Sequence, residues 1–213
     1  MSMRFALQQI GRTAPDDAVL ERYIGPPTQD TFSALVGAEH LELVAEAIRL
    51  YRVQYSQRGL FEATVYPGVV PILARFQDRG WPLYIATSKP VAFARRIAEH
   101  FGLSRYFSGA YGSEFDGTRS DKVELLRHVV LTEQLAPANT VMIGDCEQDI
   151  RGARENSLYS IGALWGYGTR NELAAAGADV LCEAPASLAR ELQLRADHIA
   201  EKAADLEAGG ERP

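Results

Sequence analysis

Several features that mark particular protein classes are scarce in this sequence. Two cysteines, Cys146 and Cys182, are too few for a disulfide framework and indicate a reducing, cytoplasmic environment. Acidic residues outnumber basic ones, 28 against 22, and the net charge of −6 disfavours binding to a nucleic-acid polymer. The longest apolar runs fall short of the roughly 20 residues that a membrane helix needs, so we expect no membrane partner. A globular cytoplasmic protein remains.

Several catalytic arrangements also lack support. The four histidines are scattered along the chain, which favours neither a zinc site nor a Ser-His-Asp triad. No basic neighbour is evident to activate Cys146, so we expect it to be a packed residue rather than a reactive thiol. No Asp-x-Asp follows an apolar strand anywhere in the sequence. The sequence therefore does not indicate hydrolysis by a zinc site, a Ser-His-Asp triad, a reactive thiol or an Asp-x-Asp of its own.

The hydrophobic pattern divides the chain at Tyr66-Pro67-Gly68. Before it, helical spacing predicts an amphipathic N-terminal helix, a helix capped by Asp16-Asp17, and helices over 29–36 and 41–57. After it, helices alternate with short apolar strands expected at 82–86, 106–111, 140–143, 159–164 and 180–182. Such alternation predicts an α/β fold with a doubly wound, Rossmann-like parallel sheet. Residues 195–213 are expected to form a frayed or disordered tail.

Polar side chains follow two of the expected strands. Thr87 and Ser88 end the strand over 82–86, and Gly144-Asp145 ends the strand over 140–143. Ligands of doubly wound sheets bind at the carboxyl ends of strands. A hydroxyl with free backbone N–H groups can hold phosphate oxygens there, although Thr87 is equally suited to cap the next helix.

Acidic and basic groups complete the candidate site. Asp145 and Asp149 offer the carboxylate oxygens that Mg²⁺ prefers, or they belong to an ordinary acidic loop between a strand and a helix. Lys122, at the start of an expected helix, either offsets the charge of phosphate and clustered carboxylates or is a solvated surface lysine.

In this order and on these elements, the residues resemble the haloacid dehalogenase superfamily of phosphohydrolases. Thr87 matches the second motif of that family, Lys122 the third, and Asp145 with Asp149 the fourth. The segments Tyr66-Pro67-Gly68-Val69 and Ser88-Lys89-Pro90 are similar to its phosphoglycolate phosphatase branch.

The resemblance implies a domain organisation. Residues 1–63 would form a small helical cap and residues 64–194 a Rossmann-like core. Ile24-Gly25-Pro26-Pro27 resembles the cap loop that reaches the substrate, which makes Gly25 a binding candidate. Arg119 and the following Ser120-Asp121-Lys122 are similar to a branch also associated with nucleoside monophosphate hydrolysis, so we expect Arg119 to contact substrate.

The implied reaction is phosphomonoester hydrolysis through an aspartyl-phosphate, with Mg²⁺ as cofactor and a small phosphorylated metabolite as partner. Thr87 would hold a phosphoryl oxygen, while Lys122 and Mg²⁺ would offset its charge. Phosphoglycolate is the first substrate expected and a nucleoside monophosphate the second. A homo-oligomer is one open option for the assembly.

The chain departs from the family at its first motif, the Asp-x-Asp-Gly-Thr that supplies the nucleophile. The segment 114–118 imitates this motif but has Glu114 at the nucleophile position and no apolar strand before it, so we reject it. We therefore expect the first core strand to be absent and the chain alone to be inactive. Two alternatives stay open: a pseudoenzyme that binds phosphate or a partner, and a natural protein whose upstream strand carries the nucleophile.

Overall fold

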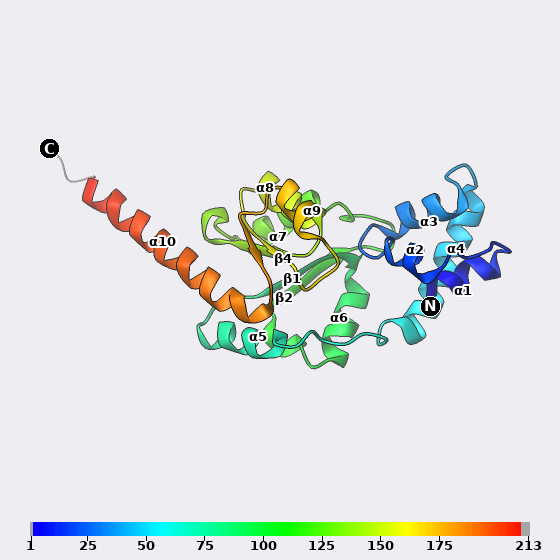
Figure 1. Cartoon of the computed structure of the whole chain (residues 1–213), viewed down its shortest axis with the longest axis horizontal. Helices are drawn as coiled ribbons and strands as arrows, with labels where there is room; N and C mark the ends of the chain where they lie inside the picture. Colours follow the sequence, from blue (N-terminus) through cyan, green and yellow to red (C-terminus); the bar gives the residue numbers. More distant parts are fainter. Residues whose placement is uncertain (1, 210–213) are drawn as a thin grey trace. The chain divides into compact units, whose positions relative to one another are not determined.

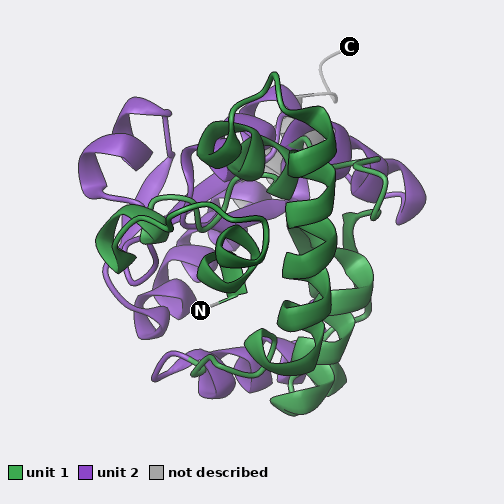
Figure 2. Ribbon diagram, turned by 90° about the vertical axis from the view of Figure 1, so that its right-hand side faces the viewer, with its two compact units in different colours: residues 1–65, 82–121 green, residues 66–81, 122–213 purple. Residues whose placement is uncertain are grey.

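The structure of the protein is a computed structural model that describes residues 2–209, with side chains through residue 200. Two compact units divide the chain (Figure 2): residues 1–65 and 82–121 form unit 1, and residues 66–81 and 122–213 form unit 2. The chain order of the elements can be followed in Figure 1. This division groups the residues differently from the expected cap (1–63) and core (64–194), which stay a prediction.

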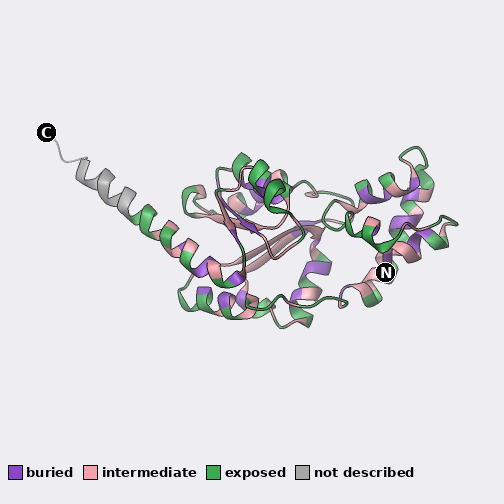
Figure 3. Ribbon diagram, viewed as in Figure 1, coloured by how far each residue is buried: buried purple, intermediate pink, exposed green. Residues whose placement is uncertain are grey.

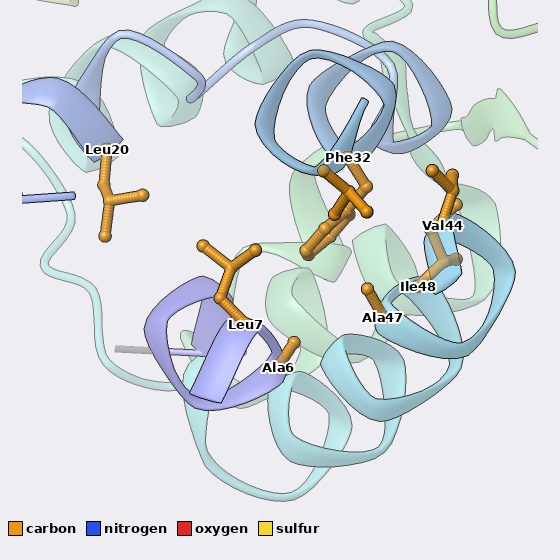
Figure 4. Close-up of a cluster of buried hydrophobic side chains, with 8 residues drawn as sticks. Ala6, Leu7, Leu20, Phe32, Val44, Ala47 and Ile48 are labelled. Carbon is orange, nitrogen blue, oxygen red and sulfur yellow. The ribbon is translucent and has the colours of Figure 1, made fainter. Parts of the chain in front are cut away.

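Unit 1 begins with four helices: α1 (Ser2–Gln9), α2 (Asp17–Glu21), α3 (Thr28–Val36) and α4 (Leu41–Gln54), the last followed by a π-helical turn, η1 (Tyr55–Gly59). The Asp16 carboxylate caps α2 by accepting the Val19 amide at 2.9 Å, as its sequence position predicts. Apolar side chains spaced three and four residues apart point inward from α1, α3 and α4 (Figure 4). They enclose Phe32, which is fully buried.

The rest of unit 1 is a parallel β–α–β segment. It consists of β1 (Tyr84–Pro90), α6 (Val91–His100), a 3-10 turn η2 (Ser104–Tyr106) and β2 (Gly109–Ser113). Residues 84–87 of β1 pair in parallel with residues 109–112 of β2, and the register shifts between Thr87 and Pro90. The carboxyl ends of both strands therefore lie at the same edge of this sheet, with Thr87 where the regular pairing ends.

Unit 2 contains a three-stranded parallel sheet in the order β3–β4–β5. In chain order the unit comprises α5 (Val69–Asp78), α7 (Lys122–Thr132), η3 (Pro137–Asn139), β3 (Val141–Gly144), α8 (Glu147–Glu155), β4 (Tyr159–Ala163), α9 (Arg170–Ala175), β5 (Val180–Cys182), η4 (Pro185–Ser187) and α10 (Leu188–Gly209). The parallel order confirms the predicted α/β class with parallel sheets.

Burial differs sharply between two neighbouring strands of unit 2 (Figure 3). Residues 160–163 of β4 are buried, whereas every residue of β3 is only half-buried. β4 has a hydrogen-bonded strand on each side, and within the described residues β3 pairs with β4 alone. β3 is therefore an edge strand of this sheet. Its sequence is nevertheless apolar, as is typical of an interior parallel strand that is covered on both faces.

The prediction of a frayed tail is wrong for residues 195–209, which continue α10. Alanine is the commonest residue of this stretch, and its high helix propensity favours continuation of the helix. Residues 210–213 of that prediction lie outside the described residues. Among the described helices, none combines the length and the hydropathy required to cross a bilayer.

Candidate active site

The turn from β3 into α8 holds the acidic part of the site. Gly144 ends β3, Asp145 follows it, and Cys146 is the N-cap of α8. The Cys146 amide donates to Asp149 Oδ2 at 3.2 Å, which makes Asp149 part of a capping box that fixes the first turn of the helix. Local chain geometry therefore fixes where the Asp149 carboxylate lies.

Lys122 and Asp149 form a buried ion pair in unit 2. Lys122 Nζ lies 2.8 Å from Asp149 Oδ1, and the two side chains are only 7% and 10% exposed. This burial contradicts the alternative of a solvated surface lysine. A buried charge needs a partner of opposite charge, and here the Lys122 ammonium and the Asp149 carboxylate are partners to each other.

Asp145 is oriented from a different segment. Its Oδ2 accepts a 2.9 Å hydrogen bond from the Tyr167 amide, in the loop that follows β4. Asp145, Cys146 and Asp149 offer ligand atoms that lie within 4.8 Å of one another. The two carboxylates suit Mg²⁺, and the soft thiol does not. Asp149 is already paired with the Lys122 ammonium, whereas the donors to Asp145 are an uncharged amide and an uncharged thiol. Asp145 is therefore the better candidate for a direct ligand.

The Cys146 thiol has the opposite of an activated environment. Burial, followed by the negative charges of Asp145 and Asp149, raises its pKa to about 12. A thiol in this position stays protonated at neutral pH. This environment agrees with the expectation that Cys146 is a packed residue rather than a reactive thiol, which stays a prediction.

Two glycines that the sequence patterns do not single out shape this part of the site. A Cβ on Gly152 of α8 would stand 2.7 Å from Lys122 Cγ, and one on Gly166 would overlap the Asp145 carboxylate. Each glycine thus allows a close approach that any side chain would block. Gly166-Tyr167-Gly168, in the loop that follows β4, is the signal that could have revealed the second contact.

The hydroxyl groups lie in unit 1, within β1, where its regular pairing with β2 ends at Thr87. The strand expected over 82–86 therefore starts later and runs on past Thr87 and Ser88 to Pro90. The Lys89 amide donates to Thr87 Oγ1 at 3.2 Å, and Ser113 Oγ donates to the Ser88 carbonyl at 2.8 Å. Ser113 ends β2, so a cross-strand bond braces this irregular part of β1. The neighbouring Lys89 ammonium donates to Tyr55 Oη at 2.7 Å. Sequence reasoning missed this pair because its members are far apart in the chain.

The remaining candidates lie elsewhere in unit 1. Gly25 is exposed in the bend between α2 and α3, with a φ of 117°. Arg119 forms an ion pair with Glu114. Residues 114–118 form a tight turn in which the Glu114 amide donates to the Thr118 carbonyl at 2.8 Å and Asp116 Oδ1 accepts the Thr118 amide at 2.9 Å. These local bonds lower the pKa of Asp116 and give its carboxylate a structural task.

The structure thus brings the predicted residues together in two groups. Asp145, Asp149 and Lys122 meet in unit 2, and Thr87 meets Ser88 in unit 1. Convergence of the two groups on one phosphate stays a prediction, as do the binding roles of Gly25 and Arg119. Within each group, backbone bonds and a buried charge pair hold the side chains in one arrangement.

Comparison with known proteins assigns a family to this arrangement. A family model described as a haloacid dehalogenase-like hydrolase matches residues 6–156. The chain is 43% identical over 174 residues to a 5'-nucleotidase of Pseudomonas aeruginosa, covering 82% of this chain and 78% of the relative. It is 36% identical to the tyrosine-protein kinase PtkA of Mycobacterium tuberculosis, covering 78% of this chain and 56% of that protein.

Phosphoglycolate phosphatases are also related, as the resemblance implied. That of Photobacterium profundum is 29% identical and covers 67% of this chain and 62% of its own length. Among solved structures, a predicted phosphatase from Clostridium acetobutylicum superposes with a TM-score of 0.82 at 33% identity, covering 90% of this chain and 88% of that one. Sequence and fold therefore agree on one group of enzymes.

Proposed function

From the premise that the chain belongs to the haloacid dehalogenase-like hydrolase family, we propose that it serves the hydrolysis of phosphomonoesters of a small metabolite. The observation that carries the proposal is the buried Lys122–Asp149 pair next to Asp145, at the carboxyl end of β3. A buried cation at this end of a parallel strand suits an anionic ligand.

Each residue has a separate task in this proposal. Lys122 offsets negative charge on the phosphoryl oxygens, and Asp149 positions the ammonium group of Lys122. Thr87 donates its hydroxyl to one phosphoryl oxygen, and the Ser113–Ser88 bond keeps that turn in place. Positioning and electrostatic stabilisation supply most of the rate in phosphoryl transfer, so a fixed arrangement is the chief requirement.

Mg²⁺ is the cofactor proposed for this site. Asp145 would hold the ion directly, with Asp149 beside it, and the bound ion would neutralise charge on the phosphoryl group. Lys122 keeps its own task because its ammonium is already paired with Asp149.

The phosphoryl acceptor needs a carboxylate that this sequence does not provide in an Asp-x-Asp after an apolar strand. We propose that the 213-residue chain binds the phosphoryl group without turning it over. The second Asp of the same motif would supply general acid/base help, and its absence costs a further factor that is typically about 10²–10⁴.

The test compares the chain with a version preceded by an apolar strand that ends in Asp-x-Asp-Gly-Thr. Both are assayed with p-nitrophenyl phosphate and MgCl₂, and only the extended form should turn over. Turnover by the shorter chain that is lost in Asp116→Asn would overturn our rejection of residues 114–118. Activity in neither form would favour the pseudoenzyme.

Two substrate classes compete in this proposal. Phosphoglycolate is supported by the Photobacterium profundum relative, and a nucleoside 5'-monophosphate by the more similar Pseudomonas aeruginosa 5'-nucleotidase. The ratio of kcat/KM for the two esters, measured on the extended form, decides between them.

A further inference from the structure

The loop after β2 presents an aromatic ring at the same sheet edge as Thr87. Phe115 is 43% exposed and comes two residues after Ser113, the last residue of β2. Ser113 Oγ is bonded to the carbonyl of Ser88, the neighbour of Thr87. Consecutive residues span at most about 3.6 Å each, so the ring lies close to the candidate phosphate-binding turn, within the same unit.

Phe115 is held in place from two sides. Arg52 of α4 donates from Nη2 to the Phe115 carbonyl at 2.6 Å, and its guanidinium carbon lies 5.1 Å from the ring centroid. Phe93 of α6 meets the ring edge-on, with 5.1 Å between centroids. A guanidinium over one face and an aromatic edge contact both favour a fixed ring orientation.

The Arg52 side chain is partly desolvated in making these contacts. Its Nε atom is buried and has no hydrogen-bond partner among the described residues. Burial also lowers the pKa of Arg52. A single exposed apolar residue needs no explanation by itself, and Leu131, 70% exposed on α7, is an example. Phe115 differs because a partly desolvated arginine fixes both its backbone and its ring.

The turn that carries Phe115 is also closed. Gly117, with a φ of 93°, allows the chain to reverse, and the Glu114 amide donates to the Thr118 carbonyl at 2.8 Å. The ring is therefore presented on a short, hydrogen-bonded turn, which lowers the entropy lost when a ligand packs against it.

We propose that Phe115 is the platform on which the nucleobase of a nucleoside 5'-monophosphate stacks. The inference rests on the proposed function, since the phosphate of that ligand would occupy the Thr87 turn. An aromatic face stacks any base, whereas a two-carbon acid ester has no flat apolar group to place on it. Arg52 acts as a positioning residue that holds the platform from behind.

The experiment measures binding by the 213-residue chain with MgCl₂ present, using calorimetry and three probes: adenosine 5'-monophosphate, inorganic phosphate and phosphoglycolate. Phe115→Ala should weaken binding of the nucleotide about tenfold, in line with stacking energies for single bases, and leave phosphate affinity unchanged. Phe115→Trp should retain nucleotide binding. Leu131→Ala, which removes an exposed apolar side chain from α7, is the control and should change neither affinity.

The outcomes separate the two claims. Equal nucleotide affinity in Phe115→Ala and the unaltered chain, or equal loss for nucleotide and phosphate, would overturn the platform. If adenosine 5'-monophosphate binds and loses affinity in Phe115→Ala while inorganic phosphate and phosphoglycolate do not bind, the platform stands and the proposed phosphatase site fails. If none of the probes binds, both are overturned. Circular dichroism of each variant confirms that the fold is retained.

Discussion

Replacing Lys122 by methionine should be among the most destabilising single changes in unit 2. Methionine keeps most of the lysine stem, which packs against Gly152, and removes only the ammonium that lies 2.8 Å from Asp149 Oδ1. Since both side chains are at most 10% exposed, Asp149 is left as a buried carboxylate without its cation. Removing one partner of such a pair typically costs about 3–5 kcal/mol.

The penalty has a ceiling, because a carboxylate buried without a cation takes up a proton instead. Protonating an ordinary carboxyl group at pH 7 costs about 4 kcal/mol, from about 1.4 kcal/mol for each pH unit above its usual value near 3.9. The same step costs about 1.5 kcal/mol at pH 5. We therefore expect Lys122→Met to lose about 3–4 kcal/mol at pH 7 and clearly less at pH 5.

The assay is urea denaturation of four proteins: the unaltered chain, Lys122→Met, Asp149→Asn, and the double variant. The double variant should lose less than the sum of the two single losses, by at least about 2 kcal/mol, because it leaves no unpaired charge. Arg49→Met is the matched control, since Arg49 pairs with Glu46 at 2.7 Å on the surface and its loss should leave the midpoint unchanged. Additive losses, or a Lys122→Met loss no larger than that of Arg49→Met, would refute the buried pair.

Three further predictions concern the same site. Because the folded chain holds the Cys146 thiol proton up to a pKa of about 12 while an unfolded thiol releases it near 9.0, the free energy of unfolding should fall as pH rises between these values. The fall, followed by urea denaturation, should be smaller in Cys146→Ser, and an equal slope in both proteins would contradict the assignment. Calorimetric titration with MgCl₂ should show weak binding that Asp145→Asn abolishes and Asp149→Asn merely reduces, whereas tight binding that survives Asp145→Asn would exclude Asp145 as the ligand. Gly152→Ala should destabilise the chain by about 1–3 kcal/mol through overpacking against Lys122, although alanine normally stabilises a helix, and a raised urea midpoint would disprove that contact.

The sequence predicted the elements of the fold well where the chemistry is local. The capping aspartate of α2 and the strand before Asp145 both follow from patterns within a few residues. The bounds of the strands were predicted less well: the strand expected over 106–111 is β2 at Gly109–Ser113, because residues 104–106 form a 3-10 turn.

Contacts between distant residues could not be predicted in this way. Tyr55 and Lys89 pair across 34 positions, and Arg52 reaches Phe115 across 63, with no spacing rule that joins them. The approach of Gly166 to Asp145 depends on how the loop after β4 returns to the end of β3. Such contacts follow from the packing of whole elements, which a pattern in one segment does not contain.

The burial of Lys122 changes how the candidate site is understood. From sequence, Lys122, Asp145 and Asp149 look like three groups of equal standing around a ligand. In the structure, one Asp149 oxygen is paired with Lys122 and the other accepts the Cys146 amide, so the role of Asp149 is to position the site rather than to contact the substrate. Asp145 accepts the Tyr167 amide through Oδ2 and a weak hydrogen bond from the Cys146 thiol through Oδ1, and neither donor is a cation. A carboxylate held by an amide remains suited to a metal ion, whereas one already neutralised by lysine gains less from it, and for this reason the two aspartates should differ in any measurement that depends on Mg²⁺.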